Sequence, residues 1–352
     1  MKEKTADNRI FAFDMLRVVA AFSVVLLHCA AQFWYSGDVK SAEWISANAI
    51  DSVSCFGVPV FIMISGALFL ADDKKTDIKR LYLHNALRIL IVYIVWSIIY
   101  GFFDLTRFDF SKLTVHDYIL EFVSGRYHLW YLLMIFGMYI ATPFIKKMVN
   151  ALTDKELVLF IVIYFIYQIG ITTLLAIKDS YIMMNTFGAF SLPVLSGYVG
   201  YYVLGYALCK YPVRGKKEII LYLSAVLGVF LNIGLSTYKS LQNGVANKEI
   251  YDAFSIGTFL IAVAVFNLAV NHTKEERLPK AFQWLIREVS RSTLGIYMIH
   301  LLIIEFVTER SGISINLPVF LYIILLAVFS YIVGFVIMGL IRRIPYVGRY
   351  IC

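Results

Sequence analysis

Apolar blocks of about 20 residues recur along the whole chain, and this block length is the strongest constraint on its fold. A helix of that length covers roughly 30 Å, the hydrocarbon thickness of a bilayer. Hydrophobic residues make up 60% of the 352 residues and charged residues only 16%, whereas soluble domains average about 45–50% and about 25%. The pattern therefore excludes a soluble enzyme and predicts an all-α, polytopic membrane bundle.

We predict about ten spanning helices within a single integral membrane domain that covers residues 1–352. The expected spans are Ile10–Trp34, Ile45–Leu70, Leu81–Phe103, His128–Val149, Glu156–Ile177, Leu192–Leu208, Glu218–Ser236, Asp252–Asn271, Ser290–Val307 and Asn316–Ile341. The sixth and seventh are the weakest, because glycines interrupt one and the other is short. The long first block, which has no small-residue cleavage site after it, is expected to remain as a span and not to be removed as a leader.

Basic residues are divided unequally between the two sides of the predicted bundle. Over the connections, 22 of the 32 lysines and arginines lie on the side of the N-terminus and 8 on the opposite side. Because basic connections stay in the cytoplasm, both termini are predicted to lie there, in a multi-pass protein of the plasma or inner membrane. The net charge of +8 is then explained by the basic cytoplasmic connections and by their attraction to anionic lipid headgroups. The lipid bilayer is the expected partner of these residues, and a nucleic acid is not. The four cysteines lack metal-ligand spacing, and neither a metal nor a bound cofactor is expected.

The first predicted span carries an acidic, a basic and an imidazole side chain, Asp14, Arg17 and His28. Ionisable groups in hydrocarbon are costly, so each is a functional candidate. Arg17 and His28 are 11 residues apart, which is about three helical turns, so both point the same way with about 16 Å between them. An arginine suits a phosphate-bearing ligand, and an imidazole suits proton abstraction near neutral pH. The alternatives are an Arg17 that pairs with Asp14 at the interface and a His28 with a purely structural hydrogen bond.

Four motifs occur in order along the chain, and together they resemble the acyltransferase-3 family of integral membrane O-acyltransferases. They are Asp14-x-x-Arg17-x10-His28, the run from Gly57 to Gly66 that ends in Ser65-Gly66, the aromatic entry His128-Leu129-Trp130-Tyr131-Leu132, and the run from Thr293 to His300. The resemblance implies a bundle of about ten helices that transfers an acyl group, commonly acetyl. The donor would be an acyl-CoA co-substrate, and the acceptor a cell-surface or lipid-linked carbohydrate.

The resemblance also implies roles for individual residues. His28 is the expected catalytic base. The expected donor-binding residues are Arg17, Arg88, Lys79 and Arg80. The expected polar cavity residues are Asp14, Ser65, His128, Trp130, Tyr297 and His300. One departure stands out: the family often has two arginines three residues apart at the third helix, but here Asn85 occupies the first position and Arg88 the second, so the nearby Lys79 and Arg80 are proposed as substitutes.

Several structural interpretations remain open at this stage. Ser65-Gly66 is also typical of close helix packing, and Trp130 also fits an interfacial aromatic belt. His300 can make a structural hydrogen bond, and Glu305 can either pair with an interior group or reach the outer interface. A transporter or flippase for a polar solute or lipid-linked sugar is the second function, and a non-catalytic sensor is the third. The identity of the acyl group and of the acceptor, direct transfer or an acyl-enzyme, and the oligomeric state are left undetermined.

Overall fold

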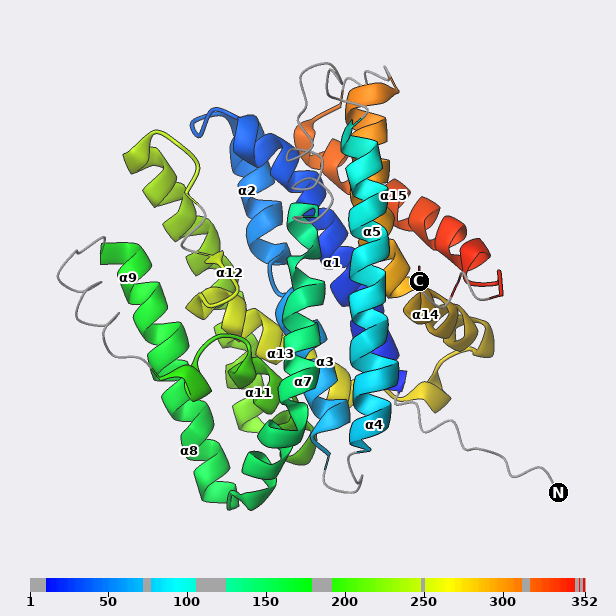
Figure 1. Cartoon of the computed structure of the whole chain (residues 1–352). Coiled ribbons are helices and arrows are strands. Elements are labelled where there is room, and N and C mark those ends of the chain that lie inside the picture. The colour runs from blue at the N-terminus through cyan, green and yellow to red at the C-terminus, as the bar shows by residue number, and fades with distance from the viewer. Residues whose placement is uncertain are drawn as a thin grey trace.

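The computed structural model describes residues 11–71, 77–105, 125–178, 192–247, 251–311 and 317–345, together with Gly348 and Ile351. Within these residues the chain forms helices and no strands (Figure 1). The predicted all-α membrane bundle is therefore confirmed.

The helices vary widely in length. The α-helices are α1 (Phe11–Ser36), α2 (Ala42–Ser54), α3 (Gly57–Phe69), α4 (Ile78–Arg80), α5 (Leu87–Leu105), α7 (Trp130–Ala151), α8 (Asp154–Tyr164), α9 (Thr172–Lys178), α11 (Val199–Lys210), α12 (Lys216–Asn243), α13 (Ile256–His272), α14 (Lys280–Glu305) and α15 (Val319–Ile341). Turns of π-helix occupy Leu81–Ala86, Phe165–Ile171 and Phe306–Arg310, and turns of 3₁₀-helix occupy Tyr127–Leu129, Pro193–Leu195 and Glu275–Arg277.

Eight helical stretches in the described part of the chain are long and apolar enough to cross a membrane. Some combine several elements: α2 and α3 form the stretch Ala42–Phe69, and α8 and α9 form Asp154–Ile177. Of the other predicted spans, α13 has 17 residues, whereas α11 has 12 and covers only about 18 Å. The sixth predicted span, Leu192–Leu208, is thus not one long helix, because Gly197 takes a φ of 62° between a 3₁₀ turn and α11. The seventh, expected to be short, is the 28-residue α12.

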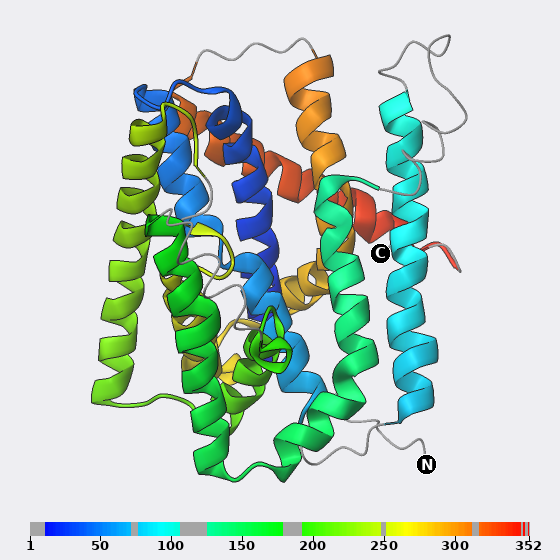
Figure 2. The same cartoon turned by 60° about the vertical axis from the view of Figure 1, so that its left-hand side comes forward.

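α1 lies inside the bundle in both overall views (Figures 1 and 2). It packs against α2, α3, α13, α14 and α15. Its buried side chains enter both hydrophobic clusters of the molecule, Leu16 in one and Val25 in the other. Since α1 carries Asp14, Arg17 and His28, this central position places the polar side chains of the first span within the protein interior and not against lipid.

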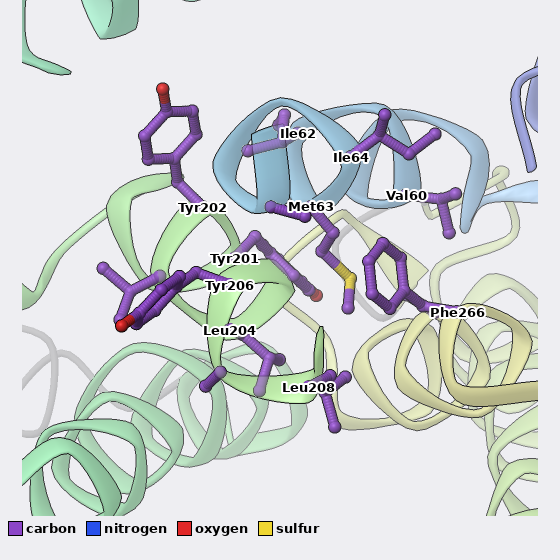
Figure 3. Packing of buried hydrophobic residues seen from close by; sticks show 14 of the residues in the cluster. Val60, Ile62, Met63, Ile64, Tyr201, Tyr202, Leu204, Tyr206, Leu208 and Phe266 are labelled. Atoms are coloured by element: carbon purple, nitrogen blue, oxygen red, sulfur yellow. The ribbon is translucent and has the colours of Figure 1, made fainter. Parts of the chain in front are cut away.

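Two glycines allow α3 and α11 to approach each other closely. A side chain at Gly66 would collide with the backbone of Tyr202, and one at Gly205 would collide with the backbone of Met63. Figure 3 shows Met63 and Tyr201 close together at this contact, with Phe266 of α13 facing them. Gly66 therefore fulfils the packing interpretation of the Ser-Gly pair. Ser65, its neighbour, lines a cavity described below.

Candidate active site

Three histidines from three separate segments meet in the interior. His28 comes from α1, His300 from α14, and His128 from the 3₁₀ turn that precedes α7. The Nε2 atom of His300 lies 2.9 Å from Nδ1 of His28. The His128 ring centroid lies 5.5 Å from that of His300 and 6.5 Å from that of His28. The structure thus brings together all three histidines that the sequence singled out.

The hydrogen bonds of His300 determine the proton positions of the pair. Its Nδ1 atom lies 2.6 Å from the backbone oxygen of Tyr297, which can only accept, so Nδ1 carries the proton. In a neutral imidazole, Nε2 of His300 is then an acceptor, and Nδ1–H of His28 donates to it. The lone pair of His28 consequently resides on Nε2. This is the tautomer that a general base requires, with the second nitrogen held by a partner.

His28 and His128 line a cavity of about 120 Å³, which we call the histidine cavity. Its other walls include Trp130, Tyr198 and Tyr251, and the Trp130 and Tyr198 rings are stacked with centroids 5.6 Å apart. His128 is only 1% exposed, yet neither of its ring nitrogens has a partner at hydrogen-bonding geometry among the described residues. Buried polar atoms are usually satisfied, so these nitrogens are suited to a hydroxyl-bearing ligand.

A second cavity, of about 350 Å³, is lined by Arg17, Arg88 and Arg291, and we call it the arginine cavity. Ser65 and Asn85 also line it. Among the described residues of its wall, none is acidic. Guanidinium groups match phosphate and carboxylate oxygens, so this wall favours an anionic ligand.

Asp14 connects α1 to α14 beside the arginine cavity. Its Oδ1 atom accepts from Arg17 Nη1 at 3.1 Å and from the Ser290 hydroxyl at 2.7 Å. Asp14 is completely buried, whereas a quarter of the Arg17 side chain is exposed. The ion pair that the interfacial interpretation of Arg17 required is present, and Arg17 lines the cavity at the same time.

Tyr297 is the one residue that lines both cavities, among the residues the structure describes. Its hydroxyl donates to the backbone oxygen of His128 at 2.5 Å. Its ring contacts the rings of His300 and Tyr131, with centroids 5.7 Å and 5.5 Å away. Tyr297 therefore forms a partition between the two cavities.

The structure does not bring every predicted residue to a cavity. Lys79 and Arg80 lie in α4 on the exposed end of the third span, and neither is in the wall of the arginine cavity. Asn85, which was regarded only as a departure from the family pattern, is in that wall. Glu305, left open between two interpretations, is 6% exposed and pairs with Arg126, so the interior ion pair is the one observed.

Three charged residues at or beside the two cavities were not predicted from the sequence: Arg126, Arg291, and Asp252, which lines the histidine cavity. Arg126 pairs with both Asp104 and Glu305 next to the histidines. Arg291 was counted with the basic residues of a cytoplasmic connection, although it is the second residue of the predicted ninth span, Ser290–Val307. The helix in fact begins at Lys280, and its first turns contain too many polar residues to be recognised as an apolar block. The helical spacing of the apolar residues between Lys280 and Ser290 could have revealed this earlier start of the helix.

Comparisons with known proteins complete the description of the site. Residues 10–339 match the family model described as an acyltransferase domain, which is nearly the whole chain. No curated protein and no solved structure matches the chain.

In the described part of the molecule, no group of three or more His, Cys, Asp or Glu side chains could hold a metal ion.

Proposed function

Because the chain belongs to the acyltransferase-3 family and is thus a multi-pass membrane acyltransferase, we propose that it transfers an acetyl group from acetyl-CoA to a carbohydrate. The acceptor would be a hydroxyl of a cell-surface or lipid-linked glycan on the outer side of the plasma or inner membrane. The donor would enter the arginine cavity from the cytoplasm.

One observation carries this proposal: a cationic cavity and a histidine-lined cavity meet at a single side chain, Tyr297. The first suits the phosphates of CoA, and the second suits an uncharged hydroxyl next to a base. The spacing supports the same arrangement, because about 16 Å of α1 separates Arg17 from His28. The long, uncharged pantetheine arm would cover that distance and bring the thioester past Tyr297.

The reaction follows from the tautomer of the His28–His300 pair. Nε2 of His28 takes the proton of the acceptor hydroxyl while the oxygen attacks the thioester carbonyl carbon. A C–O bond forms, the C–S bond breaks, and the CoA thiolate leaves with the proton that His28 then returns. His300 accepts from Nδ1–H of His28 throughout, which holds the ring and stabilises its protonated form.

The test is CoA release from acetyl-CoA by the purified protein, followed with a thiol reagent. His28→Ala is expected to lower kcat by roughly 10²–10⁴, the usual contribution of a general base. His272→Ala is the matched control, because His272 is a half-exposed histidine that pairs with Glu218 and lines neither cavity. Its kcat is expected to stay at the wild-type value.

Other outcomes would decide against the proposal. A wild-type protein that neither binds nor consumes acetyl-CoA would refute the choice of donor. Full activity of His28→Ala would refute the assignment of the base. Uptake of a polar solute or a lipid-linked sugar in the absence of any acyl donor would favour a transporter.

A further inference from the structure

The arginine cavity receives its third guanidinium from Arg291, at a position where the motifs predicted no ligand contact. The three arginines of its wall come from three different helices or helical stretches: Arg17 from α1, Arg88 from α5 and Arg291 from α14. Three separate elements thus direct positive charge into one hollow of about 350 Å³. Convergence of this kind suits a ligand with more than one anionic group.

Two carboxylates of the described residues pair with arginines of this cavity, and both lie outside its wall. Glu288 pairs with Arg291 at 2.5 Å, but it also pairs with Arg342, so one carboxylate serves two guanidinium groups. Asp14 pairs with Arg17 from a completely buried position outside the wall. Among the described residues, the wall of the cavity itself is therefore basic.

Asn85 is an uncharged residue of the same wall, at a position where the family often has an arginine. It lines the cavity one helical turn before Arg88, and an amide cannot pair with a phosphate as a guanidinium does. Arg291 reaches this cavity from the neighbouring α14. Glu288, three residues earlier on α14, accepts from Nη1 of Arg291 and holds the side chain in place, and an arginine has five N–H donors in total.

We propose that Arg291 binds a phosphate of the donor and supplies the positive charge that Asn85 does not. The inference rests on the proposed function, because it takes a CoA thioester as the donor. It assigns to α14 the contribution that the sequence had given to Lys79 and Arg80. Donor recognition is then divided among α1, α5 and α14.

The experiment compares two donors that share the thioester and differ in phosphate. Acetyl-CoA carries three phosphates, and S-acetylpantetheine carries none. Arg291→Ala is expected to raise KM for acetyl-CoA roughly 10- to 100-fold, as expected for the loss of one hydrogen-bonded charge. It should leave KM for acetylpantetheine and both kcat values within about twofold of wild type, because the reacting atoms lie at His28. Affinity for free CoA, measured by calorimetry, should fall by the same factor as KM rises.

Two further variants make the test specific. Arg287→Ala removes an arginine one turn earlier on α14 that pairs with Glu275 and does not line the cavity, so KM for acetyl-CoA should not change. Asn85→Arg in the Arg291→Ala background should recover part of the lost affinity, which also shows that the protein is folded. An equal rise of KM for both donors, an Arg287→Ala effect as large as that of Arg291→Ala, or unchanged CoA binding would overturn the inference. Wild-type protein that uses neither donor would instead mark the failure of the proposed function itself.

Discussion

The two cavities differ in the chemistry that surrounds them, although α1 and α14 contribute to both. The histidine cavity is small, its His128 ring is buried and His28 is partly buried, and four aromatic rings stand in its wall beside small and aliphatic side chains. The arginine cavity is about three times larger, and its guanidinium groups are partly or largely exposed. The first region thus centres on a pair of hydrogen-bonded imidazoles, and the second on three guanidinium groups.

This difference shows how a membrane protein can place two unlike ligands next to each other. A charged ligand stays near water, where arginines cost little to keep ionised. The base lies deeper, where exclusion of water strengthens each hydrogen bond. Tyr297 separates the two regions, so variants in each cavity and at Tyr297 itself should have different effects on activity.

On the histidine side, the residue to change is His300, the partner of the base. His300→Ala removes the acceptor for Nδ1–H of His28, so the lone pair is no longer fixed on Nε2. We expect kcat for CoA release to fall about tenfold, the value of one hydrogen bond, with KM for acetyl-CoA unchanged. His300→Gln, whose amide oxygen can still accept, should retain more activity. Equal and unchanged kcat values in both variants would reduce His300 to a structural residue.

A smaller effect is expected at the partition. Tyr297→Phe keeps the ring but loses the hydrogen bond to the backbone oxygen of His128. The free energy of unfolding should fall by about 1 kcal/mol. Hydrolysis of acetyl-CoA without an acceptor should rise up to about fivefold, because water then reaches the thioester more easily.

The control for the partition is Tyr100→Phe. Tyr100 is also buried and donates to a backbone oxygen, that of Met298 at 2.6 Å, but it lines neither cavity. It should lose similar stability, measured by thermal unfolding in detergent, without any rise in hydrolysis. If both variants hydrolyse acetyl-CoA equally fast, Tyr297 does not act as the partition.

The smallest effect is expected outside both cavities, at two of the four residues that the sequence predicted for the donor. Lys79→Ala and Arg80→Ala each remove an exposed charge that is absent from the cavity wall. Exposed charges contribute about 0–1 kcal/mol, so KM for acetyl-CoA should change by less than about fivefold and by less than in Arg88→Ala. Increases as large as that of Arg88→Ala would extend the donor site to the exposed end of the helix.

Much of the fold could be predicted because hydrocarbon imposes a simple rule on sequence. Apolar blocks of span length indicated an all-α membrane bundle, and the structure contains eight such stretches among its described residues. The prediction failed at α11, where Gly197 breaks the helix, and at the start of α14, where polar residues hide three helical turns. Hydropathy alone indicated neither the break at Gly197 nor the polar first turns of α14.

The sequence by itself determined that the chain enters a membrane as helices and that Arg17 and His28 share one helix face, because both follow from residue order and helix geometry. Only the tertiary structure decided which side chains meet. His28, His128 and His300 are separated by up to 272 positions in the chain, and the hydrogen bond that selects the tautomer exists only when α1 packs on α14. Arg291 and Asn85 likewise share one wall only because α14 and the third span border the same cavity. Contacts between distant segments depend on helix packing, which no single sequence periodicity encodes.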